Sequence, residues 1–394
     1  MYNNDVTEKT LMKICLTINS SPWSMFKGGG QLAVNHLACS LSAKGHEVHA
    51  LYSKNSDEHF EVDVPYKIHW AQHHDFSTFN LNIFSYSKVL APLAAKEKFD
   101  VIHGNAEEAC GVGNIAGRIK AAYVFTSHAP NIPTTGMLQG MAHPIRFLKS
   151  INTYLLRQAM DEADRIVAFS QFSRKLIVNG LGNACANRVE VIPPGIESSW
   201  FEVEQNKIIP AQLLFWGRVE EEKGLTELFV ALNTVAKKFP NVKLILVGEG
   251  NRLQEYKSLV TDLGLSNLVE FAGWLNNQEI QALAAKCSIG IFPSRIESFG
   301  LSVVEAMATG LPVIAARGGA VPENIEDGVT GSLVSVNNSD ALAETINKAL
   351  ENPQSAETMA KTAKSAVQQK FSWDRAADSM IEIYKNIRMK TPSI

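Results

Sequence analysis

Several features that define large classes of proteins are missing from this chain of 394 residues. Its five cysteines are odd in number and show no CxxC spacing, so neither a disulfide framework nor a zinc site is indicated and a reducing cytoplasm is the simpler compartment. No segment approaches the about 18 uninterrupted apolar residues of a membrane span, and the amino terminus lacks the pattern of a signal peptide. The net charge of only −3 lacks the basic excess of a general nucleic-acid binder.

Histidine is absent from the second half of the chain, because all ten histidines occur at or before position 143. Any histidine that takes part in chemistry must therefore come from the first half. Three of them, His69, His73 and His74, have no acid or cysteine spacing that would indicate a metal site.

The composition that is present fits a soluble, enzyme-like α/β protein: 45% hydrophobic and 20% charged residues in a chain long enough for two domains. After a predicted disordered lead-in over residues 1–10, apolar strand-like runs alternate with helical patterns, which is typical of doubly wound parallel sheets. The runs of the first half are KICLTIN (13–19), EVHALY (47–52), DVIHGN (100–105), AAYVFTSH (121–128) and RIVAFS (165–170).

The second half repeats the alternation, so the sequence predicts two Rossmann-like domains in tandem. Its runs are QLLFWG (212–217), VKLILVG (242–248), VEFAG (269–273), IGIFPS (289–294) and PVIAA (312–316). Two prolines and a glycine within 189–201 indicate the break, which gives domains over 1–196 and 197–370. Residues 371–394 contain an amphipathic helix that we expect to pack back on the first domain. Ligands are expected in a cleft at the carboxyl ends of the strands.

The stretch PSRIESFGLSVVEAMATGLPVIA (293–315) places two acids, Glu297 and Glu305, on a loop and on the helix that follows it. Gly310, followed by a proline, predicts a helix over 301–309. Backbone amides at the start of that helix, around Ser298, Phe299, Gly300 and Leu301, can bind an anion or a polar ligand. Each carboxylate can accept two hydroxyl hydrogen bonds, as vicinal sugar hydroxyls require. From spacing alone, this interpretation and that of two ordinary surface charges are equally good.

Two cations, Arg218 and Lys223, occur in a loop between a strand and a helix. This position suits a diphosphate. Surface pairing with the acids at 220–222 is the alternative, and from sequence it is more plausible for Lys223 than for Arg218.

In the first half, Gly28, Gly29 and Gly30 form a turn that lets a phosphate or sugar approach the backbone. Because this turn is not GxGxxG, a dinucleotide oxidoreductase is disfavoured. His128 ends a strand, where its imidazole can donate a hydrogen bond to a ligand, whereas His103 is interpreted as structural. The range 143–160 is a basic amphipathic helix candidate that could touch an anionic membrane from the cytoplasmic side, although an ordinary half-buried helix is the more common case.

In their order along the chain, these segments resemble the retaining nucleotide-sugar glycosyltransferases of family 4 (glycosyl transferases group 1), which have the GT-B fold. The resemblance is specific in the second half (GRVEEEKG, ILVGEG, VEFAGWL, the 293–315 stretch, GGAVPENIEDGVTGSLV) and looser in the first. It implies that the first domain binds an acceptor and the second binds a nucleotide-sugar donor.

The resemblance also implies roles for individual residues. Glu297 would contact the donor sugar and Glu305 the ribose, with the helix-start amides beside the sugar and phosphate. Arg218 and Lys223 would neutralise the donor diphosphate, and the donor phosphate would approach the backbone at Gly28 and Gly29. His128 would lie near the reaction centre, and the backbone at Trp274 would pair with the nucleobase. Gly30 is an extra glycine relative to the family pattern.

The implied reaction moves a hexose from a UDP- or GDP-sugar to a hydroxyl acceptor (a glycan, a lipid-linked acceptor or a small glycoside), with retention and without a metal or cofactor. A GT-B epimerase and a non-catalytic nucleotide-sugar binder remain as alternatives. The acceptor is expected to be recognised by the loops at 53–80 and 129–150, and Arg295 and Ile296 are expected to help select the donor sugar.

Overall fold

The computed structural model describes residues 11–24, 28–72, 82–128 and 144–390. The predicted lead-in over 1–10 and parts of the two expected acceptor loops lie outside these ranges. Contacts between Cα atoms divide the chain into two compact units. Unit 1 comprises residues 1–169, 174–192 and 373–394, and unit 2 comprises residues 170–173 and 193–372.

Unit 1 is built on a seven-stranded, fully parallel sheet in the order β3-β2-β1-β4-β5-β6-β7. Its strands are β1 (Lys13–Thr17), β2 (Glu47–Lys54), β3 (Lys67–Gln72), β4 (Val101–Gly104), β5 (Ala122–Ser127), β6 (Arg165–Ala168) and β7 (Val189–Val191). Its helices are α1 (Gly29–Ala43), α2 (Asn82–Glu97), α3 (Val112–Ile119), α4 (Pro144–Asp161), α5 (Gln171–Leu181) and α13 (Trp373–Lys390). The first three residues of α5 are counted with unit 2.

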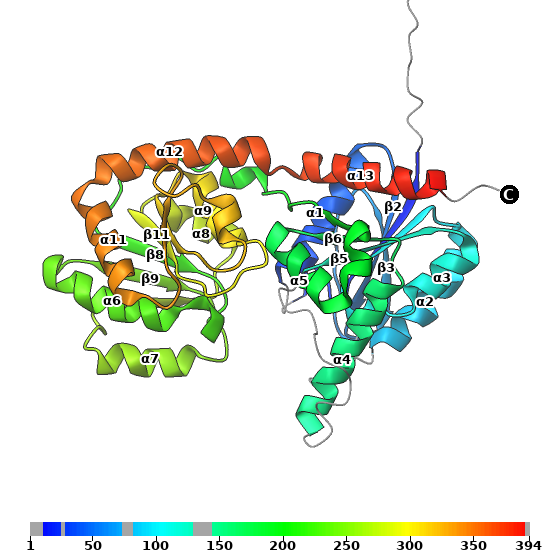
Figure 1. Ribbon diagram of the computed structural model, residues 1–394, viewed down its shortest axis with the longest axis horizontal. Helices are drawn as coiled ribbons and strands as arrows, with labels where there is room; N and C mark the ends of the chain where they lie inside the picture. The colour runs from blue at the N-terminus through cyan, green and yellow to red at the C-terminus, as the bar shows by residue number, and fades with distance from the viewer. Residues whose placement is uncertain (1–10, 25–27, 73–81, 129–143, 391–394) are drawn as a thin grey trace, which may run out of the picture. The chain divides into compact units, whose positions relative to one another are not determined.

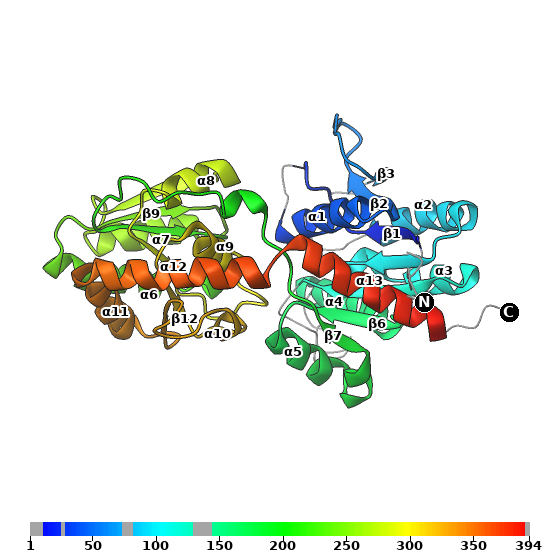
Figure 2. The same cartoon turned by 90° about the horizontal axis from the view of Figure 1, so that it is seen from above.

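Both faces of this sheet are covered, which explains why its strands are continuous apolar runs rather than alternating ones. Successive residues of β1 still point to opposite layers, because side chains of a strand alternate. Ile14 and Leu16 pack in the layer that contains α1 and α13, whereas Cys15 packs in the layer with α2, α3, α4 and α5. The last helix, α13, contacts α1, and Figures 1 and 2 both show the two side by side.

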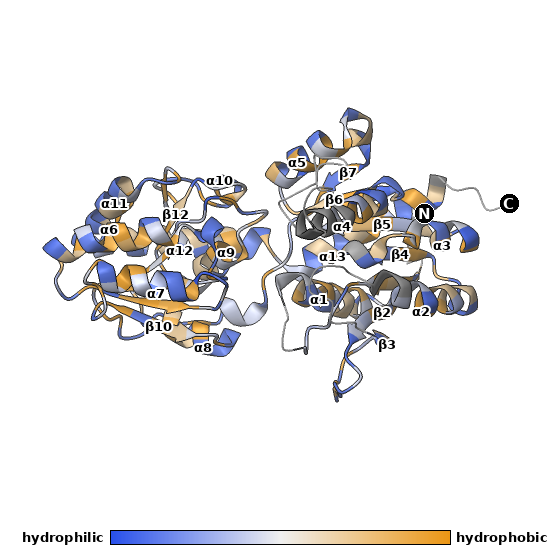
Figure 3. Ribbon diagram, turned by 90° about the horizontal axis from the view of Figure 1, so that it is seen from below, coloured by the Kyte–Doolittle hydropathy of each residue, from blue (hydrophilic) through white to orange (hydrophobic). Residues whose placement is uncertain are grey.

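Unit 2 contains a six-stranded parallel sheet in the order β10-β9-β8-β11-β12-β13. The strands are β8 (Gln212–Trp216), β9 (Lys243–Val247), β10 (Val269–Gly273), β11 (Ile289–Phe292), β12 (Val313–Ala316) and β13 (Ser332–Val334). The helices are α6 (Leu225–Lys238), α7 (Leu253–Asp262), α8 (Asn277–Ala284), α9 (Leu301–Thr309), α10 (Val321–Asn324), α11 (Ser339–Glu351) and α12 (Pro353–Lys370). Figure 3 shows apolar strands flanked by helices that carry polar residues on their outer sides.

In each sheet the strand order reverses beside the first strand of that unit. β1 pairs with β2 on one side and β4 on the other, and β8 pairs in the same way with β9 and β11. At such a point the connections from neighbouring strands leave toward opposite faces, which opens a crevice at the carboxyl ends of the strands. Most of the candidate site residues predicted from the sequence follow these strands.

Candidate active site

The loop that carries Glu297 follows β11 and runs into α9. The predicted helix over 301–309 is confirmed, because α9 spans Leu301–Thr309. Its N-cap is Gly300, at φ 87°, and no side chain caps the helix. Phe299 is buried and its ring meets Phe371 edge-on at 5.2 Å, so its own contribution to a ligand would be its backbone. The amides at this helix start remain suited to a negatively charged oxygen.

Lys223 and Glu297 form the central ion pair of this site. Lys223 ends a short 3-10 helix, η5 (Glu221–Lys223), in the connection that leaves β8. Its Nζ lies 2.6 Å from Glu297 Oε1, and each side chain is 13% exposed. An ion pair so shielded from water is screened less than one on the open surface. The cation and the acid, to which the family resemblance assigns different parts of the donor, therefore contact each other in this structure.

Arg218 lies at the same edge of the sheet but in a different environment. Its Nη2 lies 3.0 Å from Glu222 Oε1, and the arginine side chain is 72% exposed. The expectation that pairing with 220–222 suits Lys223 better than Arg218 is therefore wrong, since Arg218 makes that pair. The reason is local: Arg218 and Glu222 are four residues apart along a turn, whereas Lys223 is directed toward the loop after β11.

Arg295 connects the two loops that carry Lys223 and Glu297. Its guanidinium contacts Glu227 Oε1 of α6 at 2.8 Å and Glu221 Oε1 of η5 at 3.4 Å. Its backbone N–H donates to the carbonyl of Glu222 at 2.7 Å. In this structure Arg295 thus ties η5 to the β11 loop, a role that no sequence signal indicated. Its expected part in donor selection stays a prediction.

Glu305 lies within α9, and one of its oxygens is held by a residue that sequence reasoning read only as part of a strand. Trp216, the last residue of β8, donates its indole N–H to Glu305 Oε2 at 3.0 Å. Burial raises the pKa of the Glu305 carboxyl to about 7, with the charge of Glu197 adding to the effect and the Trp216 hydrogen bond opposing it. The carboxyl group is therefore a mixture of neutral and ionised forms near pH 7.

Two glycines hold the Glu297 loop against the next connection. Gly319, at φ 60°, lies where a Cβ atom would be 2.3 Å from the carbonyl oxygen of Glu297 and 2.6 Å from its nitrogen. The neighbouring Gly318 makes a similarly close approach to Ser294. Ala320 N–H donates to the Glu297 carbonyl at 2.9 Å. Only glycine permits backbones to come this close, so the turn at 318–319 sets the position of Glu297.

Trp274 follows β10 at the carboxyl edge of the second sheet, and its side chain is 57% exposed.

Two predicted site glycines lie at the start of a helix in unit 1. Gly28 is the N-cap of α1, and Gly29 is the first residue of that helix. The Gly28 N–H donates to Gln31 Oε1 at 3.0 Å, which fixes the first turn of the helix. The implied ligand contacts of Trp274, Gly28 and Gly29 stay predictions.

His128 follows β5, as expected, and is half-buried. Its Nε2 lies 2.9 Å from Asn105 Oδ1, and its ring packs edge-on against Phe169 at 5.0 Å. Burial lowers the pKa of His128 to about 4, so the ring is neutral at pH 7. His103 is fully buried, with Nδ1 2.6 Å from Tyr384 Oη and Nε2 2.7 Å from Thr126 Oγ1. Its structural interpretation fits these two contacts.

One group among the described residues has the geometry to hold a metal ion: Glu47, His49 and Glu97, whose ligand atoms lie within 4.8 Å of one another. Lys13 Nζ lies 3.3 Å from Glu47 Oε2 and 2.9 Å from Glu97 Oε2, and Lys67 Nζ lies 2.7 Å from Glu47 Oε1. Two ammonium groups thus already balance the two carboxylates. We interpret the cluster as an ion-pair network at the amino-terminal edge of the first sheet.

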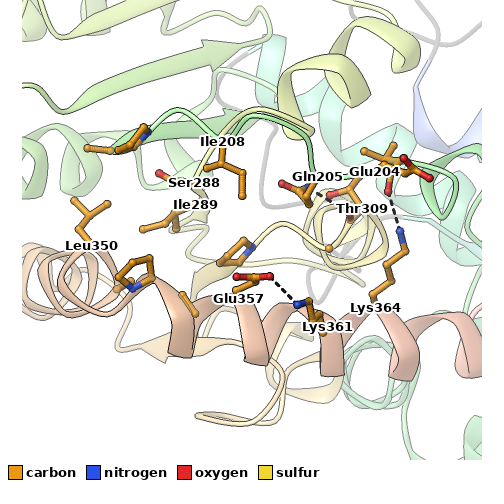
Figure 4. Close-up of a pocket in the computed structure, with 18 residues that line it drawn as sticks. Glu204, Gln205, Ile208, Ser288, Ile289, Thr309, Leu350, Glu357, Lys361 and Lys364 are labelled. Atoms are coloured by element: carbon orange, nitrogen blue, oxygen red, sulfur yellow. Dashed lines mark hydrogen bonds and ion pairs between the residues drawn. The ribbon is translucent and has the colours of Figure 1, made fainter.

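Unit 2 also contains a cavity of about 600 Å³, and Figure 4 shows the side chains that line it. It is lined by Ala211, Ser288 and Pro312, which precede β8, β11 and β12, and by one side of α12. It therefore opens at the amino-terminal edge of the sheet, opposite the edge that carries Lys223 and Glu297. Parallel sheets bind their ligands at the carboxyl edge, so the cavity is separate from the candidate site.

Comparison with known protein families identifies the class. The model of Glycosyltransferase Family 4 matches residues 27–200, and that of Glycosyl transferases group 1 matches residues 198–366. Together the two matches include every strand of both sheets except β1. The chain belongs to the group 1 glycosyltransferases, which have the GT-B fold.

Individual relatives agree with this assignment. The chain is 27% identical to an uncharacterized glycosyltransferase of Methanocaldococcus jannaschii, covering 91% of this chain and 94% of the relative. It is 29% identical to the D-inositol 3-phosphate glycosyltransferase of Mycolicibacterium smegmatis over 73% of this chain and 67% of that one.

Solved structures agree in fold. Sucrose-phosphate synthase of Thermosynechococcus elongatus has a TM-score of 0.78 at 21% identity, covering 96% of this chain and 100% of the other. HepE of Anabaena, in a complex with UDP-glucose, has a TM-score of 0.71 at 22% identity, covering 95% of this chain and 100% of the other. Within the described residues, no helix combines the length and apolar character that crossing a membrane requires.

Proposed function

We propose that this glycosyltransferase moves a hexose from a UDP- or GDP-sugar to a hydroxyl acceptor with retention of the anomeric configuration. The observation that carries the proposal is the grouping of Lys223, Glu297 and Glu305 around the carboxyl ends of β8 and β11. Structures of similar fold have been determined with UDP and with UDP-glucose, which supports a nucleotide sugar as the donor.

The proposed chemistry needs a stabilised leaving group more than it needs an acid or base on the protein. As the bond between the sugar carbon and the diphosphate breaks, negative charge grows on the departing phosphate. Lys223, Arg218 and the amides at the start of α9 would stabilise that charge more than they stabilise the intact donor. The acceptor oxygen forms the new bond on the same face, and its proton passes to the departing phosphate. Glu297 would hold sugar hydroxyls and Glu305 the ribose.

The direct test is incubation with a panel of UDP-, GDP- and ADP-sugars and candidate acceptors. Nucleotide release that depends on an acceptor, with the transferred sugar in its original anomeric form by NMR, would support the proposal. Inversion would overturn the retaining assignment, and sugar epimers without an acceptor would indicate an epimerase instead. A thermal shift with each donor identifies the nucleotide before any acceptor is known.

Transfer is expected to continue unchanged in EDTA. In the proposed mechanism the positive charge that neutralises the diphosphate comes from Lys223 and Arg218, which a chelator cannot remove. Initial rates measured with EDTA and with added Mg²⁺ or Mn²⁺ check this. A strict requirement for either ion would contradict the metal-free mechanism.

Donor binding is expected to weaken by about tenfold between pH 8 and pH 6. Ribose hydroxyls donate hydrogen bonds to an ionised carboxylate, and the Glu305 carboxyl has a pKa of about 7 before the donor binds. Acidification therefore costs affinity, because the donor must displace a proton. Calorimetric titration of a UDP-sugar at several pH values measures the change.

The matched control for this pH dependence is Glu305→Gln, which keeps the shape of the side chain but cannot titrate. Its amide oxygen can still accept from the Trp216 indole, so an NH₂ group would face the ribose. We expect weak, pH-independent binding in this variant. Equal pH dependence in both proteins would contradict the assignment of Glu305.

Peripheral membrane contact through α4 stays a proposal. Arg157, one of its three basic residues, donates from Nη1 to the Gly180 carbonyl at 3.1 Å and lies 3.6 Å from Asp161, so that cation already has partners within unit 1. Flotation with vesicles of anionic and of neutral lipid tests the contact. If equal amounts of protein float with anionic and with neutral vesicles, the proposed attraction to an anionic membrane is contradicted.

A further inference from the structure

Asn105, which sequence reasoning did not single out, has a fully determined orientation. It follows β4 at the point where the strand order of unit 1 reverses, and it is buried. Its Nδ2 lies 3.0 Å from the Thr17 carbonyl oxygen and 3.3 Å from that of His103. Carbonyl oxygens only accept hydrogen bonds, so the NH₂ group must face them. The amide oxygen of Asn105 must consequently face the other way, toward His128.

That orientation fixes the tautomer of His128. Asn105 Oδ1 can only accept a hydrogen bond, and it lies 2.9 Å from His128 Nε2. The proton of the neutral ring is therefore on Nε2, and Nδ1 carries the lone pair. Nδ1 faces the first turn of α1, where a Cβ atom on Gly30 would lie 3.4 Å away. His103, whose own pKa is affected by the charge of His128, is itself neutral because burial lowers its pKa to about 3.

We propose that Asn105 is the positioning residue that holds His128 as the Nε2–H tautomer and presents its Nδ1 as an acceptor beside the start of α1. In this proposal the N–H of the imidazole donates to Asn105, so the ring would accept a hydrogen bond from a ligand instead of donating one as the sequence suggested. An imidazole nitrogen that carries a lone pair can accept a hydrogen bond from a hydroxyl or an amide N–H. The consequence for catalysis rests on the proposed function, whereas the tautomer does not.

Ring-nitrogen NMR of the full-length protein, labelled with ¹⁵N-histidine, tests the tautomer without donor or acceptor. His128→Gln assigns the signals of His128 by their loss. In the wild type at pH 7 we expect a protonated Nε2 and an unprotonated Nδ1. A wild-type ring protonated on Nδ1, or on both nitrogens, overturns the proposal.

Two variants of Asn105 are compared in the same experiment. Asn105→Ala removes the acceptor and is expected to give a mixture of the two tautomers. Asn105→Asp is nearly isosteric and brings a negative charge, so it is expected to raise the pKa of His128 by about 1–3 units. Thr126→Val, which removes a hydrogen bond from the neighbouring His103, is the control and should leave the His128 signals in place. Unchanged His128 signals in both Asn105 variants overturn the proposal.

Kinetics then connect the tautomer to the reaction. Asn105→Ala is expected to lower kcat by about 10- to 100-fold while the donor KM changes by less than about threefold. Asn105→Asp is expected to shift the acidic limb of the pH–rate profile, which loss of folded protein would not do. Wild-type kcat in Asn105→Ala would overturn the positioning role. If no donor is ever transferred, the proposed function fails but the NMR result on Asn105 stands by itself.

Discussion

Replacing Lys223 with methionine is expected to lower kcat/KM for transfer by about 10³-fold. The Lys223 side chain is only 13% exposed, and in the proposed mechanism its ammonium group stabilises the charge that develops on the leaving diphosphate. Steady-state rates of acceptor-dependent nucleotide release measure the loss. Near-normal turnover would contradict the role assigned to Lys223.

Because Lys223 also forms an ion pair with Glu297, its substitution can lower stability as well as catalysis, and the two effects must be separated. Methionine at 223 leaves the Glu297 carboxylate, which is 13% exposed, without its partner, and an unpaired shielded charge destabilises the fold. The double variant Lys223→Met/Glu297→Gln removes both charges. We expect its Tm to recover toward the wild-type value and its activity to stay low. Recovery of activity in the double variant would show that the pair is structural only.

Arg218→Gln provides a comparison at the same edge of the sheet. Arg218 is largely exposed, and its pair with Glu222 is a surface pair that contributes little to stability. We expect a smaller loss of transfer, about 10- to 100-fold, and an unchanged Tm. The difference between the two cations reports how strongly solvent shielding matters in this site.

Gly319→Ala is expected to reduce transfer by about 10²-fold although the residue carries no functional group. The added Cβ would lie 2.3 Å from the Glu297 carbonyl oxygen, a distance that forces the backbone of one of the two loops to move. Glu297 would then be misplaced relative to both Lys223 and the sugar. Rates and Tm of the purified variant, with donor KM measured separately, check this expectation.

Gly328→Ala is the matched control for Gly319→Ala. Gly328 also has a left-handed conformation, at φ 77°, but no atom lies within 4 Å of its added Cβ. Both substitutions therefore carry the conformational cost of about 1–2 kcal/mol, and only the one at 319 displaces Glu297. Equal activity in the two variants would contradict the idea that the 318–319 turn positions the acid.

The secondary structure could be predicted because its signals are local. Gly310 and the proline after it end α9 at the expected residue, and apolar runs bounded by glycine and proline mark β8, β9, β10 and β11. The two parallel sheets follow from the alternation of these runs with helices. Family membership was also available from the sequence, since the ordered motifs extend over most of the chain.

The contacts within the site could not be predicted from the same signals. Lys223 and Glu297 are 74 positions apart, and nothing in either segment says that their side chains meet. Pairing with the acids of the same turn was considered less plausible for Arg218 than for Lys223, yet Arg218 pairs with Glu222. The contact between His128 and Asn105 was not predicted either, because Asn105 is 23 positions away and follows another strand.

The two sheets, the family, and the set of charged and glycine residues at the carboxyl ends of the strands could thus be derived from the sequence alone. Propensity, periodicity and turn chemistry act over a few residues, so they can be recognised in the sequence alone. Folding set which acid meets which cation, how far Glu305 is shielded from water and which side chain contacts Nε2 of His128. Those properties depend on how closely folding brings distant segments together and how deeply it buries them, and a pKa responds to both.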